Sequence, residues 1–122
     1  MQNRIHPALV YGTAWKKDRT AVLVETALRA GFRGVDTACQ PRHYNELLVG
    51  EGIRRAIDQG TARSSLFIQT KFTPVGGQDQ HSTPYDPKAR LTDQVLQSFA
   101  VSQKNLGMDY VDSLVLHSPY PR

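Results

Sequence analysis

Four side chains that can carry protons or charge stand at or just after the ends of apolar segments. Asp36 follows the short strand-like segment of residues 32–35, Lys71 follows residues 66–70, and His117 follows residues 110–116. Tyr44 lies in the segment D-T-A-C-Q-P-R-H-Y, eight residues after Asp36. A carboxylate, a phenol, an ammonium and an imidazole together suit the reduction of a carbonyl, in which a hydride attacks the carbon while an acid protonates the oxygen.

Each residue type has a role in such a reaction. A tyrosine phenol has an ordinary pKa of about 10, too high for ready proton exchange at neutral pH, and a nearby ammonium lowers that value. Lys71 is the candidate for the ammonium, and Asp36 for the carboxylate that keeps a partly buried lysine protonated. His117 would donate a hydrogen bond to the substrate oxygen and orient it. Tyr44 is then the general acid.

Ordinary structural explanations also exist for these residues taken singly. Asp36 is able to cap a turn or a helix, Lys71 to be a solvated strand end, and His117 to bond backbone carbonyls. Their recurrence at one strand end after another, with a tyrosine in the adjoining loop, favours the catalytic interpretation.

The elements that must position these residues alternate regularly along the chain. Short apolar runs predict strands, and apolar residues at helical spacing closed by Gly31, Gly60 and Gly107 predict helices. Asp86 and Pro87 are typical of a helix start. The predicted strands are residues 8–11, 32–35, 66–70 and 110–116, and the predicted helices are residues 20–30, 45–59 and 88–106.

Strictly alternating strands and helices predict parallel strands joined by right-handed crossovers. Such a run is either an open doubly wound sheet or the first half of a (β/α)8 barrel. The glycine-rich G-x-G-x-x-G turn of the open sheet is absent after the first strand, where only Gly12 stands. The sequence therefore predicts an α/β fold of the (β/α)8 TIM-barrel type, with about four β/α units, in which the carboxyl ends of the strands form the catalytic face.

Composition excludes several other classes of protein. The chain has 122 residues, the length of one domain, and fifteen Lys and Arg against eleven Asp and Glu give a net charge of +4. Because the basic residues are scattered, we expect no nucleic-acid partner. The single cysteine, Cys39, permits no internal disulfide and forms no zinc site by itself, so no metal is expected. No segment predicts a membrane span or a secretory signal, which predicts a cytoplasmic protein.

Five stretches resemble the aldo-keto reductase superfamily and keep its order. They are G-T-A-W from residue 12, G-F-R-G-V-D-T-A from residue 31, Y-N-E-L-L-V-G from residue 44, L-F-I-Q-T-K-F from residue 66, and L-G-M-D-Y-V-D-S-L-V-L-H-S-P from residue 106. The resemblance covers most of the chain. It implies an NADPH-dependent (β/α)8 barrel that reduces an aldehyde or ketone with an Asp-Tyr-Lys-His tetrad.

The resemblance assigns the tetrad to Asp36, Tyr44, Lys71 and His117. It also places Gly12, Thr13 and Asp36 near the cofactor, and Trp15 near the nicotinamide or the substrate. In this sequence Tyr44 lies further from the aspartate than in the family pattern, because of the residues Q-P-R-H that precede it.

A second loop belongs to the same rim. Residues 73–86 are polar and rich in Gly and Pro, so they predict a long loop. We expect it either to line a substrate pocket, with Phe72, Tyr85 and Trp15 as apolar walls, or to be a surface loop without contact to a ligand.

A complete barrel has eight strands and typically about 250 residues, and its phosphate site commonly uses the loops after strands seven and eight. We therefore expect this chain alone to bind NADPH weakly. Three interpretations remain open: a portion of a full reductase, a homodimer that closes an eight-stranded assembly, or a catalytically incomplete half-barrel that acts as a binding module.

Overall fold

The computed structural model describes residues 6–119. Its strands are β1 (Val10–Gly12), β2 (Gly34–Asp36), β3 (Phe67–Phe72) and β4 (Ser113–Leu116), and its α-helices are α1 (Thr20–Arg29), α2 (Glu46–Asp58) and α3 (Leu91–Leu106). Three short 3-10 helices, η1 (Lys17–Arg19), η2 (Arg63–Ser65) and η3 (Val75–Gly77), lie in the connections. None of the helices in this part of the chain is long and apolar enough to cross a membrane.

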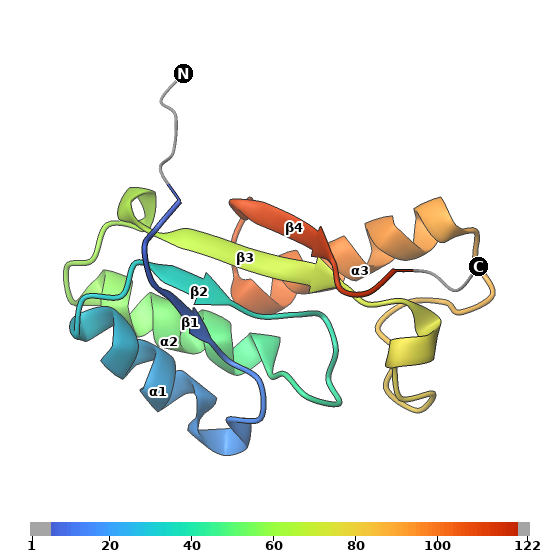
Figure 1. The fold of residues 1–122 in the computed structure, drawn as a ribbon, viewed down its shortest axis with the longest axis horizontal. Coiled ribbons are helices and arrows are strands. Elements are labelled where there is room, and N and C mark those ends of the chain that lie inside the picture. Colours follow the sequence, from blue (N-terminus) through green and yellow to red (C-terminus); the bar gives the residue numbers. More distant parts are fainter. Residues whose placement is uncertain (1–5, 120–122) are drawn as a thin grey trace.

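The four strands form one parallel sheet in the order β1-β2-β3-β4, as predicted. The helices lie along one side of this sheet (Figure 1). Consecutive strands are neighbours, and each pair is joined by a crossover that contains a helix. This is the arrangement of half a (β/α) barrel.

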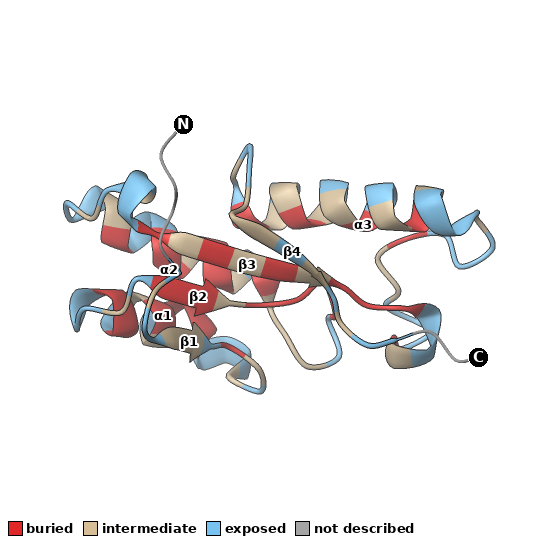
Figure 2. Cartoon of the chain, turned by 45° about the horizontal axis from the view of Figure 1, so that its top comes forward, coloured by how far each residue is buried: buried red, intermediate tan, exposed pale blue. Residues whose placement is uncertain are grey.

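Burial alternates along β3 because successive side chains point to opposite faces of a strand. Ile68, Thr70 and Phe72 are buried against the helices, whereas Gln69 and Lys71 are half-buried on the opposite face. Figure 2 shows this alternation along β3. The face without helices therefore carries the polar side chains of the strand ends.

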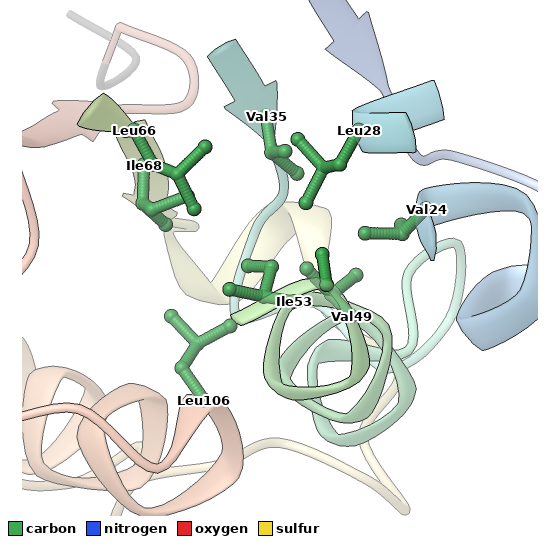
Figure 3. Packing of buried hydrophobic residues seen from close by; sticks show 9 residues of the cluster. Val24, Leu28, Val35, Val49, Ile53, Leu66, Ile68 and Leu106 are labelled. Atoms are coloured by element: carbon green, nitrogen blue, oxygen red, sulfur yellow. The ribbon is translucent and has the colours of Figure 1, made fainter. Parts of the chain in front are cut away.

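The hydrophobic core lies between the sheet and the helices (Figure 3). Its members are buried aliphatic side chains, contributed by α1, β2, α2, β3, the residue before β3, and α3: Val24, Leu28, Val35, Val49, Ile53, Ala56, Leu66, Ile68 and Leu106. Two glycines allow α2 to approach its neighbours closely: a Cβ at Gly50 would lie 2.7 Å from the carbonyl oxygen of Asn105, and one at Gly52 would lie 2.8 Å from Val24 Cβ. The core thus holds α2, and with it the loop that precedes α2, in a defined position.

The predicted start of the third helix is wrong. α3 begins at Leu91 rather than at residue 88, and Arg90, in an extended conformation, precedes it without a side-chain cap. Asp86 instead accepts a hydrogen bond from the backbone N–H of Lys88, 2.9 Å away, within a separate turn. The predicted end is confirmed, because Gly107 adopts the left-handed conformation with φ of 66°.

Candidate active site

The carboxyl ends of β2, β3 and β4 bring three of the predicted residues to one edge of the sheet. Asp36 is the last residue of β2, and Lys71 lies one residue before the end of β3. His117 follows β4 directly, and its backbone N–H donates to the carbonyl oxygen of Phe72 at 2.9 Å. The strand register therefore determines how these residues stand relative to one another.

Asp36 and Lys71 form an ion pair on the face of the sheet without helices. Lys71 Nζ lies 2.7 Å from Asp36 Oδ2, and the two side chains are 12% and 23% exposed. Lys71 Nζ also donates to the carbonyl oxygen of Thr37 at 3.0 Å, and Asp36 Oδ1 accepts from Gln69 Nε2 at 2.9 Å. Gln69 Oε1 in turn accepts from the Ser113 hydroxyl at 2.8 Å, so a chain of polar contacts runs across three strands.

Tyr44 lies beside this pair although its loop is long. Its ring centroid is 5.1 Å from Lys71 Nζ and 5.8 Å from the ring centroid of His117. The preceding residues make a turn in which the carbonyl oxygen of Gln40 accepts hydrogen bonds from the backbone N–H groups of His43 and Tyr44. The structure thus brings together all four residues that the sequence places at the site.

Two glutamines connect the Tyr44 loop to the loop that follows β3. Gln40 Nε2 donates to the carbonyl oxygen of Gly77 at 2.7 Å, and Gln78 Nε2 donates to that of Cys39 at 2.9 Å. Both side chains are buried. The four residues that separate Cys39 from Tyr44 are therefore anchored at one end by reciprocal amide contacts, and at the other by Asn45, whose side chain caps α2 through the N–H of Leu48.

The loop of residues 73–86 is anchored to the rim by a few buried residues, whereas residues 79–82 are exposed. Its Thr73 is buried, and the Thr73 carbonyl oxygen accepts from Tyr85 Oη at 2.6 Å and from Gln78 Nε2 at 3.3 Å. The Thr73 hydroxyl lies 2.7 Å from His117 Nδ1. When this hydroxyl donates, the proton of a neutral imidazole sits on Nε2, the nitrogen left to face a substrate.

Partial burial lowers the pKa of His117 below its ordinary value of 6.5. The neighbouring Lys71 ammonium lowers this pKa further, Asp36 opposes the shift, and His43 contributes a smaller lowering. The neutral imidazole is therefore favoured at neutral pH.

The residues predicted to meet cofactor or substrate fall in different places. A Cβ at Gly12 would meet no atom within 4 Å, so the space over the end of β1 is open. Thr13 is fully buried, and its hydroxyl donates to the Asp36 carbonyl oxygen at 2.8 Å, which makes it a support of Asp36. Trp15 is 65% exposed and packs its ring on His43, with ring centroids 4.2 Å apart.

Phe72 departs from its predicted role in substrate binding. It is 3% exposed, lies on the helix side of β3 opposite to Lys71, and packs against Tyr85 with ring centroids 5.2 Å apart. Because β-strand side chains alternate between faces, the residue next to Lys71 points away from the site. Phe72 and Tyr85 are thus buried residues that pack against each other beneath the rim.

Sequence reasoning missed Gln69 and Thr73, the polar partners of Asp36 and His117. For Gln69 a signal existed, because the two-residue period of a strand puts it on the same face as Lys71. For Thr73 no local pattern indicates the contact with His117, which joins residues 44 positions apart.

Comparison with known proteins gives one family. The model of the aldo/keto reductase family matches residues 8–122. Morphine 6-dehydrogenase of Pseudomonas putida is 36% identical over 115 residues, which are 93% of this chain and 32% of that protein. The aldehyde reductase YPR1 of Saccharomyces cerevisiae is 36% identical over 94% of this chain and 31% of its own length. The chain thus spans about a third of the length of the curated relatives it matches.

Solved structures agree with the sequence match. The aldose reductase of Schistosoma japonicum superposes with a TM-score of 0.74 at 26% identity, covering 97% of this chain and 35% of that one. A Bombyx mori aldo-keto reductase in complex with NADP superposes with a TM-score of 0.69 at 29% identity, covering 91% and 34%. The chain described here belongs to the aldo/keto reductase family.

Proposed function

We propose that this chain carries the proton-transfer residues of an NADPH-dependent reduction of an aldehyde or ketone. The observation that supports the proposal is the convergence of a phenol, an ammonium, a carboxylate and an imidazole at one rim of the sheet. The family is one of oxidoreductases, and one structural neighbour contains NADP.

In the proposed reaction Tyr44 is the general acid. The substrate carbonyl oxygen accepts hydrogen bonds from the Tyr44 phenol and from His117 Nε2, and the phenol proton moves to this oxygen as negative charge develops on it. Lys71, 5.1 Å from the Tyr44 ring centroid, stabilises the phenolate that remains. Asp36 pairs with the Lys71 ammonium and fixes its position through the 2.7 Å contact.

NADPH, when bound, would supply the hydride that adds to the carbonyl carbon. The open space over Gly12 fits the approach of a flat ring to the backbone at the end of β1, next to Asp36. Thr13 offers no free hydroxyl to such a group, because its side chain is buried and bonded to Asp36.

The test is a pair of phenylalanine variants of the 122-residue chain. Tyr44→Phe should abolish NADPH-dependent reduction of an aldehyde while leaving unchanged the NADPH affinity measured by cofactor fluorescence. Tyr11→Phe, which removes a phenol oxygen from β1, is the matched control and should keep activity. Turnover retained by Tyr44→Phe would exclude Tyr44 as the acid, and absence of NADPH binding at high micromolar protein would exclude enzymatic function for this chain alone.

A second candidate function is that of a self-associating half-barrel without catalysis. The edge strand β4 favours it, because Leu114 and Leu116 are 44% and 52% exposed. Light scattering separates the two: a dimer that binds no NADPH would support the second candidate.

A further inference from the structure

A pocket of about 120 Å³ opens beside Tyr44, and Asp36, Lys71 and His117 are not among its lining residues. Its lining comes from two loops, the one after β1 and the one before α2: Trp15, Lys17, Pro41, Arg42, His43, Tyr44 and Asn45. Tyr44 therefore borders both this pocket and the cluster of Asp36, Lys71 and His117.

The pocket is positively charged. Lys17 and Arg42 line it, and no acidic residue is among its lining residues. Neither Lys17 nor Arg42 has an ion-pair partner within residues 6–119. Two exposed cations without a counter-charge at the mouth of a pocket attract an anionic group.

The two loops that line the pocket are held against each other. The backbone N–H of Trp15 donates to the carbonyl oxygen of His43 at 2.8 Å, and the two rings are 4.2 Å apart. Trp15 and Lys17 both have positive φ angles, 62° and 52°, which are uncommon for residues other than glycine. Backbone of this kind persists where the surroundings enforce it and clusters at ligand sites.

Three of the lining residues, Pro41, Arg42 and His43, belong to the segment that lengthens the Tyr44 loop. The longer loop thus adds charge at the mouth of the site. A guanidinium is well matched to a carboxylate, because its planar fork donates two parallel hydrogen bonds.

We infer that this pocket is an anion subsite for the substrate, so that the carbonyl compound carries a carboxylate that lies between Lys17 and Arg42 while its carbonyl meets Tyr44. The inference rests on the proposed function for the role of Tyr44. The binding of the carboxylate itself requires neither turnover nor cofactor.

Trp15 is the single tryptophan of the chain and lines the pocket, so its fluorescence reports binding directly. The probes are 4-oxobutanoate and butanal, two aldehydes of equal chain length that differ by a terminal carboxylate. We expect 4-oxobutanoate to bind about five- to tenfold more tightly than butanal at low salt, and the difference to shrink at high salt. Equal affinities for the two aldehydes would overturn the inference.

Variants locate the effect. Arg42→Gln and Lys17→Gln should each weaken 4-oxobutanoate binding by about three- to fivefold and leave butanal unchanged. Lys88→Gln, an exposed lysine outside the pocket, is the matched control and should change neither. Equal effects of Lys88→Gln and Arg42→Gln would show a general charge effect and overturn the subsite.

A third arm distinguishes the source of the anion. Inorganic phosphate and NADPH are titrated against the same variants; a dependence on Arg42 for these two, with none for 4-oxobutanoate, would assign the pocket to a phosphate group and refute the substrate carboxylate. Tyr44→Phe separates this inference from the proposed function, because it removes the proposed acid and leaves Lys17 and Arg42 in place. Selective 4-oxobutanoate binding by a wild-type chain that shows no reduction would contradict the proposed function alone.

Discussion

The Asp36–Lys71 pair offers the sharpest measurement on the site, as a double-mutant cycle. The pair is short, 2.7 Å, and largely shielded, with 12% and 23% of the two side chains exposed. Removal of one partner leaves a charge in a poorly solvated place, which costs about 3–5 kcal/mol for a fully buried pair. Allowing for the remaining exposure, we expect Asp36→Asn and Lys71→Met each to lower the free energy of unfolding by about 2–4 kcal/mol.

The double variant should lose little more than either single one, because neither charge is then left alone. The coupling free energy is expected at about 1–3 kcal/mol, measured by urea unfolding of the four proteins. Glu51 and Arg55 form a matched control on α2: their contact is also 2.7 Å, but the side chains are 42% and 43% exposed, so their coupling should be only about 0.3–0.5 kcal/mol. Additive losses at Asp36 and Lys71, within about 0.5 kcal/mol, would refute the reasoning that these charges hold each other in place.

Three further predictions follow from other parts of the structure. Gly52→Ala should lower the free energy of unfolding by about 1–3 kcal/mol, because its Cβ would lie 2.8 Å from Val24 Cβ. Gly76→Ala is the control and should be neutral, because a Cβ there meets nothing within 4 Å. Equal urea midpoints for the two variants would contradict this prediction. Burial raises the pKa of the Cys39 thiol to about 12, and Glu46 adds to the shift. A thiol reagent should therefore label Cys39 only in denaturant. Rapid labelling of the folded chain would disprove this prediction. Because the folded pKa of His117 lies below its ordinary value of 6.5, the unfolded chain binds this proton more readily than the folded chain. The contribution of His117 to stability is therefore present above about pH 6.5 and is lost as pH falls toward the folded pKa. Urea unfolding curves of His117→Gln at different pH values should lack this loss.

Much of the fold could be predicted because its signals are local. Strand and helix periods, together with Gly31, Gly60 and Gly107 at positive φ after the helices, act over a few residues. The start of α3 could not be predicted, since Asp86 and Pro87 satisfy the rules for a helix start. They instead form a separate turn, in which the backbone N–H of Lys88 donates to the Asp86 carboxylate. Local chemistry allowed both outcomes, and packing of the loop selected one.

By itself, the sequence determined that Asp36, Lys71 and His117 stand at or just after the ends of parallel strands, because the alternation of elements sends every strand in the same direction. Only the tertiary structure decided that Tyr44 reaches them despite its longer loop, which depends on a contact from Gln40 to Gly77 across 37 residues. It likewise brought the hydroxyl of Thr73 to the imidazole of His117, 44 residues away. Such contacts depend on strand register and on loops meeting in space, and neither leaves a short-range pattern in the chain.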